Sequence, residues 1–246
     1  MPQRQPIFNV PLAVLALLGV IIAVHLARLT LNEDDGLWWL IALAFIPARY
    51  SGMAHDIPGG DLAAYTSFFT HMFVHADKVH LAINGAWLLA FGSVVCRRVG
   101  ALRFLVFSLC CGLAGALLFL ALHAGLLAPV IGASGAIAGM MGAVMRFLFP
   151  AIDRREGWML RENPASIPLM PLGAALRDRR VLAATAAFVG LNLLAMIGFG
   201  SFSSEGAIAW EAHLGGYFFG LFAFGLFDIA PQRGLPTLSE DPTNVA

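Results

Sequence analysis

Charged residues are scarce in this 246-residue chain, at 12% of the total, whereas hydrophobic residues make up 59%. The mean hydropathy is +0.79. Soluble globular domains carry about 25% charged residues, so this balance excludes a water-soluble protein and predicts one that is embedded in a membrane. Fifteen basic and fifteen acidic residues leave no net positive charge. Nucleic-acid binding depends on such a charge, so we expect no nucleic-acid partner.

Cysteine is also scarce, since the chain contains only Cys96, Cys110 and Cys111, all within apolar stretches. An odd number of cysteines in such positions argues against a disulfide framework and against a cysteine-rich metal site. The three side chains are interpreted as small core residues.

Histidines are the remaining candidates for metal ligands. His71 and His75 are four residues apart and His80 follows them, but only Asp77 lies nearby to complete a tetrahedral set. We therefore expect no metal and no cofactor. Packing or loop bracing is the expected role of His71 and His75.

Long apolar runs are abundant, and they predict an all-α, polytopic membrane protein. A helix needs about 20 mostly apolar residues to cross a bilayer. Six runs qualify, and they occupy residues 9–29, 79–96, 101–123, 134–149, 181–199 and 207–228. We expect a six-transmembrane-helix domain over residues 9–228, preceded by a cytoplasmic segment 1–8 and followed by a polar, disordered tail 229–246.

The basic residues predict the orientation of these spans. An even number of spans places both termini on the same side of the membrane. Twelve of the fifteen Lys and Arg residues lie in the termini and loops of that side, whereas Arg28, Arg49 and Lys78 lie on the opposite side. Such an excess marks the cytoplasmic side. We expect a multi-pass protein of the bacterial inner membrane with both termini in the cytoplasm.

Two connections between the spans are long. Residues 30–78 lie outside and contain an apolar patch, residues 37–46, that is too short to cross and is predicted to lie at the membrane interface. Residues 150–180 lie inside, with six arginines and with prolines at positions 164, 168 and 171, and are predicted to be a polar connector with little packed structure.

Polar side chains within the spans are candidate functional residues, because burying them in a bilayer is costly. His80 and Asn84 lie four residues apart on one face of the second span. Ser134 opens the fourth span and His213 lies early in the sixth. Spans two, four and six all begin outside, so these four side chains are expected at a similar depth. The run of only 16 residues from Ser134 also predicts that residues 129–133 dip into the protein as non-helical backbone.

Glycines predict that spans four and six approach closely. Gly135 and Gly139 form one stripe of small residues, and Gly216 and Gly220 form another. If the stripes face each other, the Ser134 hydroxyl comes within hydrogen-bond reach of the His213 imidazole. A weak nucleophile is activated by a base in this way.

The motifs together resemble the rhomboid family of intramembrane serine proteases. They are His71-x-x-x-His75-x-x-x-x-His80-x-x-x-Asn84, then Gly132-Ala133-Ser134-Gly135, then Ala212-His213-x-x-Gly216-x-x-x-Gly220. The resemblance implies a six-helix core with Ser134 as nucleophile and His213 as general base. It also implies an oxyanion hole of His80, Asn84 and the Ser134 backbone amide, with Gly132, Gly135, Gly216 and Gly220 in support.

The function predicted from this resemblance is an intramembrane serine endopeptidase that cleaves transmembrane protein substrates near the extracytoplasmic face. Two alternatives remain open: an inactive rhomboid-like scaffold that binds membrane helices, and a small transporter that uses the polar cluster for a solute or proton. The chain also departs from the family, because Ala138 stands where many rhomboids carry an aromatic residue against the catalytic histidine. What holds the imidazole is left open, with Tyr217 a candidate. The family's Trp-Arg signature is not assigned to Trp38, Trp39 or Arg49.

Four further polar residues in or near the spans have no assigned function. Asn192 is expected to form an interhelical hydrogen bond to an unidentified partner. Glu211 points about 200° around its helix from His213 and is expected to face water. His25 and His123 lie near span ends and are expected at the membrane interface.

Overall fold

The computed structural model describes residues 10–196 and 209–229. This part of the chain is helical, and its only extended pairing is an isolated bridge between Phe45 and Val130. The helices are α1 (Leu12–Leu29), α2 (Glu33–Leu43), α3 (Gly60–Thr70), α4 (Lys78–Trp87), α5 (Ser93–Val99), α6 (Ala101–Leu122), α7 (Ser134–Asp153), α8 (Met159–Glu162), α9 (Leu172–Ala175), α10 (Arg179–Met196) and α11 (Trp210–Ala223). The all-α prediction is confirmed.

Four helical stretches among the described residues are long and apolar enough to cross a membrane. They are α1, the continuous helix Lys78–Val99, α6 and α7. The continuous helix joins α4 to α5 through a π-helical turn, η4 (Leu88–Gly92). The predicted fifth and sixth spans correspond to α10 and α11, but residues 197–199 and 207–208 of those spans lie outside the described residues. The number of six spans stays a prediction, as do the segments 1–8 and 230–246, which the structure does not describe.

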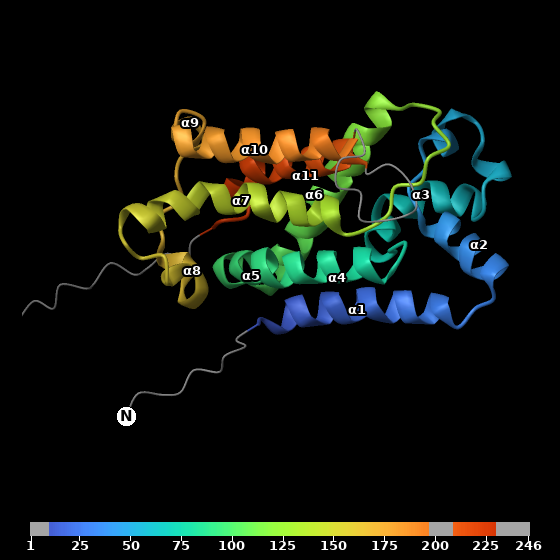
Figure 1. Cartoon of the computed structure of the whole chain (residues 1–246), viewed down its shortest axis with the longest axis horizontal. Coiled ribbons are helices and arrows are strands. Elements are labelled where there is room, and N and C mark those ends of the chain that lie inside the picture. The colour runs from blue at the N-terminus through green and yellow to red at the C-terminus, as the bar shows by residue number, and fades with distance from the viewer. Residues whose placement is uncertain (1–9, 197–208, 230–246) are drawn as a thin grey trace, which may run out of the picture.

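Helix α7 lies at the centre of the bundle, between α11 and the α4–α5 helix (Figure 1). Its contact with α11 depends on glycine. A Cβ atom added to Gly216 would lie only 1.9 Å from the Gly135 carbonyl oxygen, and one added to Gly220 would lie 1.9 Å from the Gly139 oxygen. The two glycine stripes therefore face each other as predicted, and larger side chains would force the backbones apart.

The segment after α1 folds back on itself. Asn32 caps α2 by accepting a hydrogen bond from the Asp35 backbone amide, and Trp38 and Trp39 on this helix are about half exposed. The buried Arg49 guanidinium donates to backbone carbonyl oxygens of Ile41 and Pro58, each at 2.8 Å. These two hydrogen bonds hold together the ends of the loop between Ile41 and Pro58.

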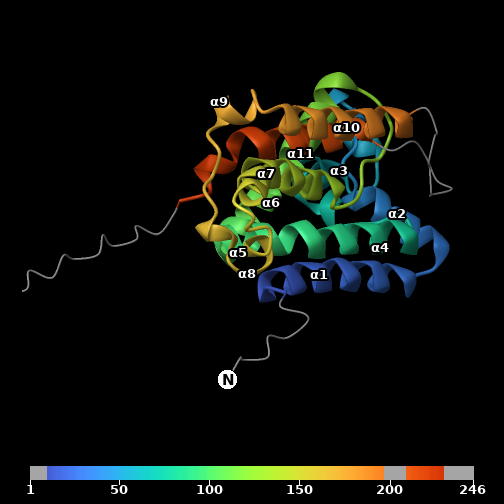
Figure 2. The ribbon, with the colours of Figure 1, turned by 60° about the vertical axis from the view of Figure 1, so that its left-hand side comes forward.

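The prediction that residues 150–180 have little packed structure was wrong. Helix α7 continues through Pro150 to Asp153, and Ile167 is fully buried. The reason lies in two buried arginines on the neighbouring helices. Arg98 donates to the carbonyl oxygens of Pro164 at 2.6 Å and Ile167 at 2.9 Å, and Arg146 donates to that of Met170 at 2.7 Å. The connector crosses one end of the bundle in Figure 2, between α7 and α10.

Candidate active site

Ser134 and His213 are hydrogen-bonded to each other. Ser134 is the first residue of α7 and His213 lies in the first turn of α11, and the Ser134 Oγ to His213 Nε2 distance is 2.7 Å. Both side chains are half-buried. The contact follows from the facing glycine stripes of α7 and α11, called here the glycine seam. Gly135 directly follows Ser134 and Gly216 lies one helical turn after His213, so the seam allows these helix ends to meet.

The backbone before Ser134 is non-helical, as predicted, and Val130, Gly132 and Ala133 are buried, although Pro129 at the start of the predicted segment is exposed. Gly132 has φ of 106°, a left-handed conformation that favours glycine. Its amide donates to the His71 carbonyl oxygen at 2.9 Å, and the Ala133 amide donates to His75 Nε2 at 3.4 Å. The argument from a short helix was nevertheless wrong, because α7 has 20 residues rather than 16. Contacts to the histidines, rather than the helix length, fix the start of α7.

His71 and His75 therefore brace this loop. Both are buried, and burial lowers the pKa of His71 to about 4 and that of His75 to about 3. The imidazoles are neutral at neutral pH, which lets His75 Nε2 accept a hydrogen bond. Within residues 10–196 and 209–229 there is no group of three or more His, Cys, Asp or Glu side chains that could hold a metal ion.

His80 lies close to Ser134, whereas the hydrogen bond of the Asn84 side chain goes to backbone rather than to Ser134. A Cβ atom on Gly132 would lie 2.7 Å from His80 Nε2 and 3.8 Å from Ser134 Oγ, so both side chains lie against the same glycine. The Asn84 amide Nδ2 donates to the His80 carbonyl oxygen at 2.9 Å, one turn back along α4. Asn84 Oδ1 is buried and has no partner in the described part of the chain.

Backbone donors are also available at the start of α7. No side chain caps this helix, and Ala133 is its N-cap residue. The first amides of a helix have no intrahelical acceptor, so they can bind a negatively charged oxygen that lies near Ser134.

Asn192 is the functional candidate whose importance the sequence did not reveal. Its Oδ1 lies 2.7 Å from His213 Nδ1, on the opposite side of the imidazole from Ser134. The predicted interhelical hydrogen bond is thus confirmed and its partner is identified. The signal in the sequence was an amide within an apolar span, but nothing local pointed to His213.

The family model of the rhomboid domain matches residues 63–228 of this chain. The chain belongs to the rhomboid family. No curated protein matches it. Rhomboids are a family of intramembrane proteases built as helical bundles, and this chain is a multi-pass membrane protein.

Tyr217 does not hold the imidazole in this rhomboid. Its hydroxyl lies 2.9 Å from the Thr185 hydroxyl, and its ring stacks on Phe188 with the centroids 4.3 Å apart. Ala138 is buried in the same cluster as Tyr217. Asn192 provides the hydrogen bond to His213 instead, from a different helix.

Glu211 pairs with His123, so the prediction that Glu211 faces water was wrong. Glu211 is 4% exposed, and its Oε1 lies 2.5 Å from His123 Nε2. The end of α6 passes the start of α11 here, which brings the two side chains together. His25 is also buried. The interface positions expected for His25 and His123 stay predictions.

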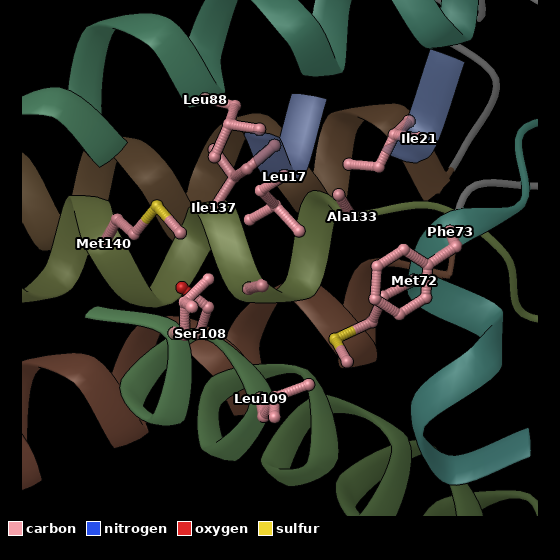
Figure 3. Close-up of a pocket in the computed structure, with 12 residues that line it drawn as sticks. Leu17, Ile21, Met72, Phe73, Leu88, Ser108, Leu109, Ala133, Ile137 and Met140 are labelled. Carbon is pink, nitrogen blue, oxygen red and sulfur yellow. The ribbon is translucent and has the colours of Figure 1, made fainter. Parts of the chain in front are cut away.

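An apolar cavity of about 210 Å³ lies among α1, α6 and α7 (Figure 3). Ala133, Ala136, Ile137 and Met140 contribute one wall, and they lie on a different face of α7 from the glycines that meet α11. The cavity contains neither Ser134 nor His213. It is therefore separate from the polar cluster of the rhomboid.

Proposed function

We propose that this rhomboid is an intramembrane serine endopeptidase with Ser134 as nucleophile and His213 as general base. The observation that supports this most directly is the 2.7 Å contact between Ser134 Oγ and His213 Nε2. A serine hydroxyl hydrogen-bonded to an imidazole that is itself hydrogen-bonded on its other nitrogen is the usual arrangement of an activated nucleophile. Both partners reside in the region that the family model matches.

The reaction begins when Ser134 Oγ attacks a substrate carbonyl carbon and His213 Nε2 takes the hydroxyl proton. The tetrahedral intermediate then collapses, the peptide C–N bond breaks, and His213 passes the proton to the leaving amine. Water, deprotonated by His213, hydrolyses the acyl-enzyme and releases Ser134. The half-buried position of both side chains supports access for water and substrate.

Negative charge on the intermediate needs donors near Ser134. His80 Nε2 and the uncapped amides at the start of α7 are placed to supply them. The Asn84 amide already donates to the His80 carbonyl oxygen. It can donate to the intermediate only if that bond breaks or if its second N–H hydrogen is used. We therefore rank His80 and the backbone above Asn84 in this role.

The proposed substrates are transmembrane proteins whose helix unwinds near the extracytoplasmic face. A fully hydrogen-bonded helix keeps its carbonyl groups within its own backbone, so a local break is needed before attack. We propose the orientation predicted by the arginine distribution, with both termini cytoplasmic and the site near the opposite surface.

The test is cleavage of a single-span substrate by purified protein, together with labelling by a serine-directed fluorophosphonate. Ser134→Ala and His213→Ala are expected to abolish both. Ser108→Ala is the matched control, because Ser108 is also a buried serine on a membrane helix but bonds only to the Phe104 carbonyl oxygen. Substrate binding that survives without any cleavage or labelling would instead indicate a scaffold, and solute uptake without labelling would indicate a transporter.

A further inference from the structure

A directional chain of hydrogen bonds runs from α10 to the Ser134 hydroxyl. The Phe188 carbonyl oxygen can only accept, so the Asn192 atom that lies 2.9 Å from it is the donor Nδ2. The amide oxygen Oδ1 must then face His213 Nδ1, at 2.7 Å. An amide oxygen also only accepts, so Nδ1 carries the imidazole proton and Nε2 is left with a lone pair for the Ser134 hydroxyl.

The orientation of this amide decides whether the histidine can act as a base. With the amide reversed, its NH₂ group would face Nδ1 and favour the tautomer that is protonated on Nε2. That tautomer cannot accept the serine proton, and such a mismatch is very costly in serine proteases. The Phe188 carbonyl oxygen excludes the reversed orientation, because two acceptors would then face each other.

Helix α10 presents Asn192 through a narrow stripe of contacts. Val181 and Asn192 are buried, Thr185 and Phe188 are half-buried, and these four residues recur at helical spacing along one face. Thr185 and Phe188 both contact Tyr217 of α11. The same face therefore docks α10 on α11 and delivers the amide to His213.

We infer that Asn192 is the positioning residue of this rhomboid, fixing the ring orientation and the tautomer of His213 from α10. This inference rests on the proposed function, because it concerns how the proposed base is held. It makes the arrangement a Ser-His-Asn set, in which the third member comes from a helix other than those that carry the serine and the histidine. The same three-part logic occurs in unrelated hydrolases, where an amide can replace the acid.

The first test compares Asn192→Ala with Leu191→Ala. Leu191 is the neighbouring residue on α10, is 66% exposed and forms none of these hydrogen bonds, so its variant controls for general effects on the helix. Removing the Asn192 acceptor leaves the Nδ1 proton without its partner and frees the ring. We expect kcat for a single-span substrate to fall on the order of 10- to 100-fold, with KM within about twofold. Leu191→Ala should retain both parameters.

The second test uses the isosteric variant Asn192→Asp, which preserves the shape and the acceptor oxygen. A carboxylate beside the imidazole favours its protonated form, so the acidic limb of the pH profile of kcat/KM should move to higher pH. Activity above that limb should exceed that of Asn192→Ala. A residue that merely packs α10 against α11 would not shift the pH profile.

Outcomes for Asn192 and for the proposed function can be separated by measuring Ser134→Ala alongside. If Ser134→Ala abolishes cleavage but both Asn192 variants keep the wild-type kcat and pH profile, the inference about Asn192 is overturned and the protease remains. If Ser134→Ala still cleaves, the proposed function itself is wrong, whatever Asn192 does. Loss of kcat in Asn192→Ala, with the shifted profile in Asn192→Asp, supports both.

Discussion

Replacing Gly216 by alanine tests whether the glycine seam creates the proposed active site. The new Cβ atom would lie 1.9 Å from the Gly135 carbonyl oxygen, a backbone atom that cannot rotate away. Cβ atoms essentially never approach another heavy atom within 3.0 Å, so α7 and α11 must separate locally by at least about 1 Å. Overpacking of this kind costs about 1–3 kcal/mol of stability.

The effect on activity should exceed the effect on folding. Gly135 adjoins Ser134, and Gly216 is three residues from His213, so the separation acts directly on their 2.7 Å hydrogen bond. An added 1 Å takes that contact beyond hydrogen-bonding range. A misplacement of this size can reduce the rate about 100-fold.

The assay is the rate of fluorophosphonate labelling of Ser134 in folded protein, with the thermal midpoint measured in the same detergent. Gly19→Ala is the matched control, since Gly19 lies in α1 with nothing within 4 Å of the added Cβ atom. It should label at the wild-type rate. Wild-type labelling by folded Gly216→Ala would refute the reasoning, because the seam would then not set the distance between Ser134 Oγ and His213 Nε2.

Three further predictions concern contacts away from Ser134. Glu211→Ala and His123→Ala should each lower the thermal midpoint, and the double variant should lower it no further than the larger single effect, because both remove one hydrogen-bonded pair. Burial lowers the pKa of His75 to about 3, so below about pH 6.5 the unfolded state binds a proton that the folded state does not. The contribution of this group to stability should therefore be complete above that pH and decrease as the pH falls towards 3. Thermal midpoints measured across this range should fall less steeply in His75→Asn. Arg98→Met leaves the Asp228 carboxylate without its buried partner, which should cost about 3–5 kcal/mol and lower the midpoint. It also removes the hydrogen bonds to the carbonyl oxygens of Pro164 and Ile167, so proteolysis of the connector before α9 should be faster, and unchanged proteolysis would contradict the role given to Arg98.

Local sequence signals predicted much of the fold and the contact between Ser134 and His213. Apolar runs placed α1, α4–α5, α6 and α7 to within a few residues at most ends, because a membrane helix is defined by its own composition. Glycine spacing predicted the contact of α7 with α11. It worked because small residues at helical period mark a face by themselves, without knowledge of the partner.

Packed connections were poorly predicted from composition. Residues 150–180 contain arginines and prolines typical of a solvated loop, yet Arg98 and Arg146 bind that loop from helices distant in sequence. Glu211 was likewise expected to face water. Its partner His123 is 88 residues away, and only the crossing of α6 and α11 places it there.

The sequence by itself determined that this chain enters a membrane and that burying its few polar side chains there costs free energy. It also determined that Ser134 and His213 can approach each other. These features depend on residue type and periodicity, which are local properties. The tertiary structure decided how the histidine is held, because an amide at position 192 acquires a partner only when α10 docks on α11. Hydrogen-bond direction is set by the atoms that face each other across helices, and no pattern along one helix encodes it.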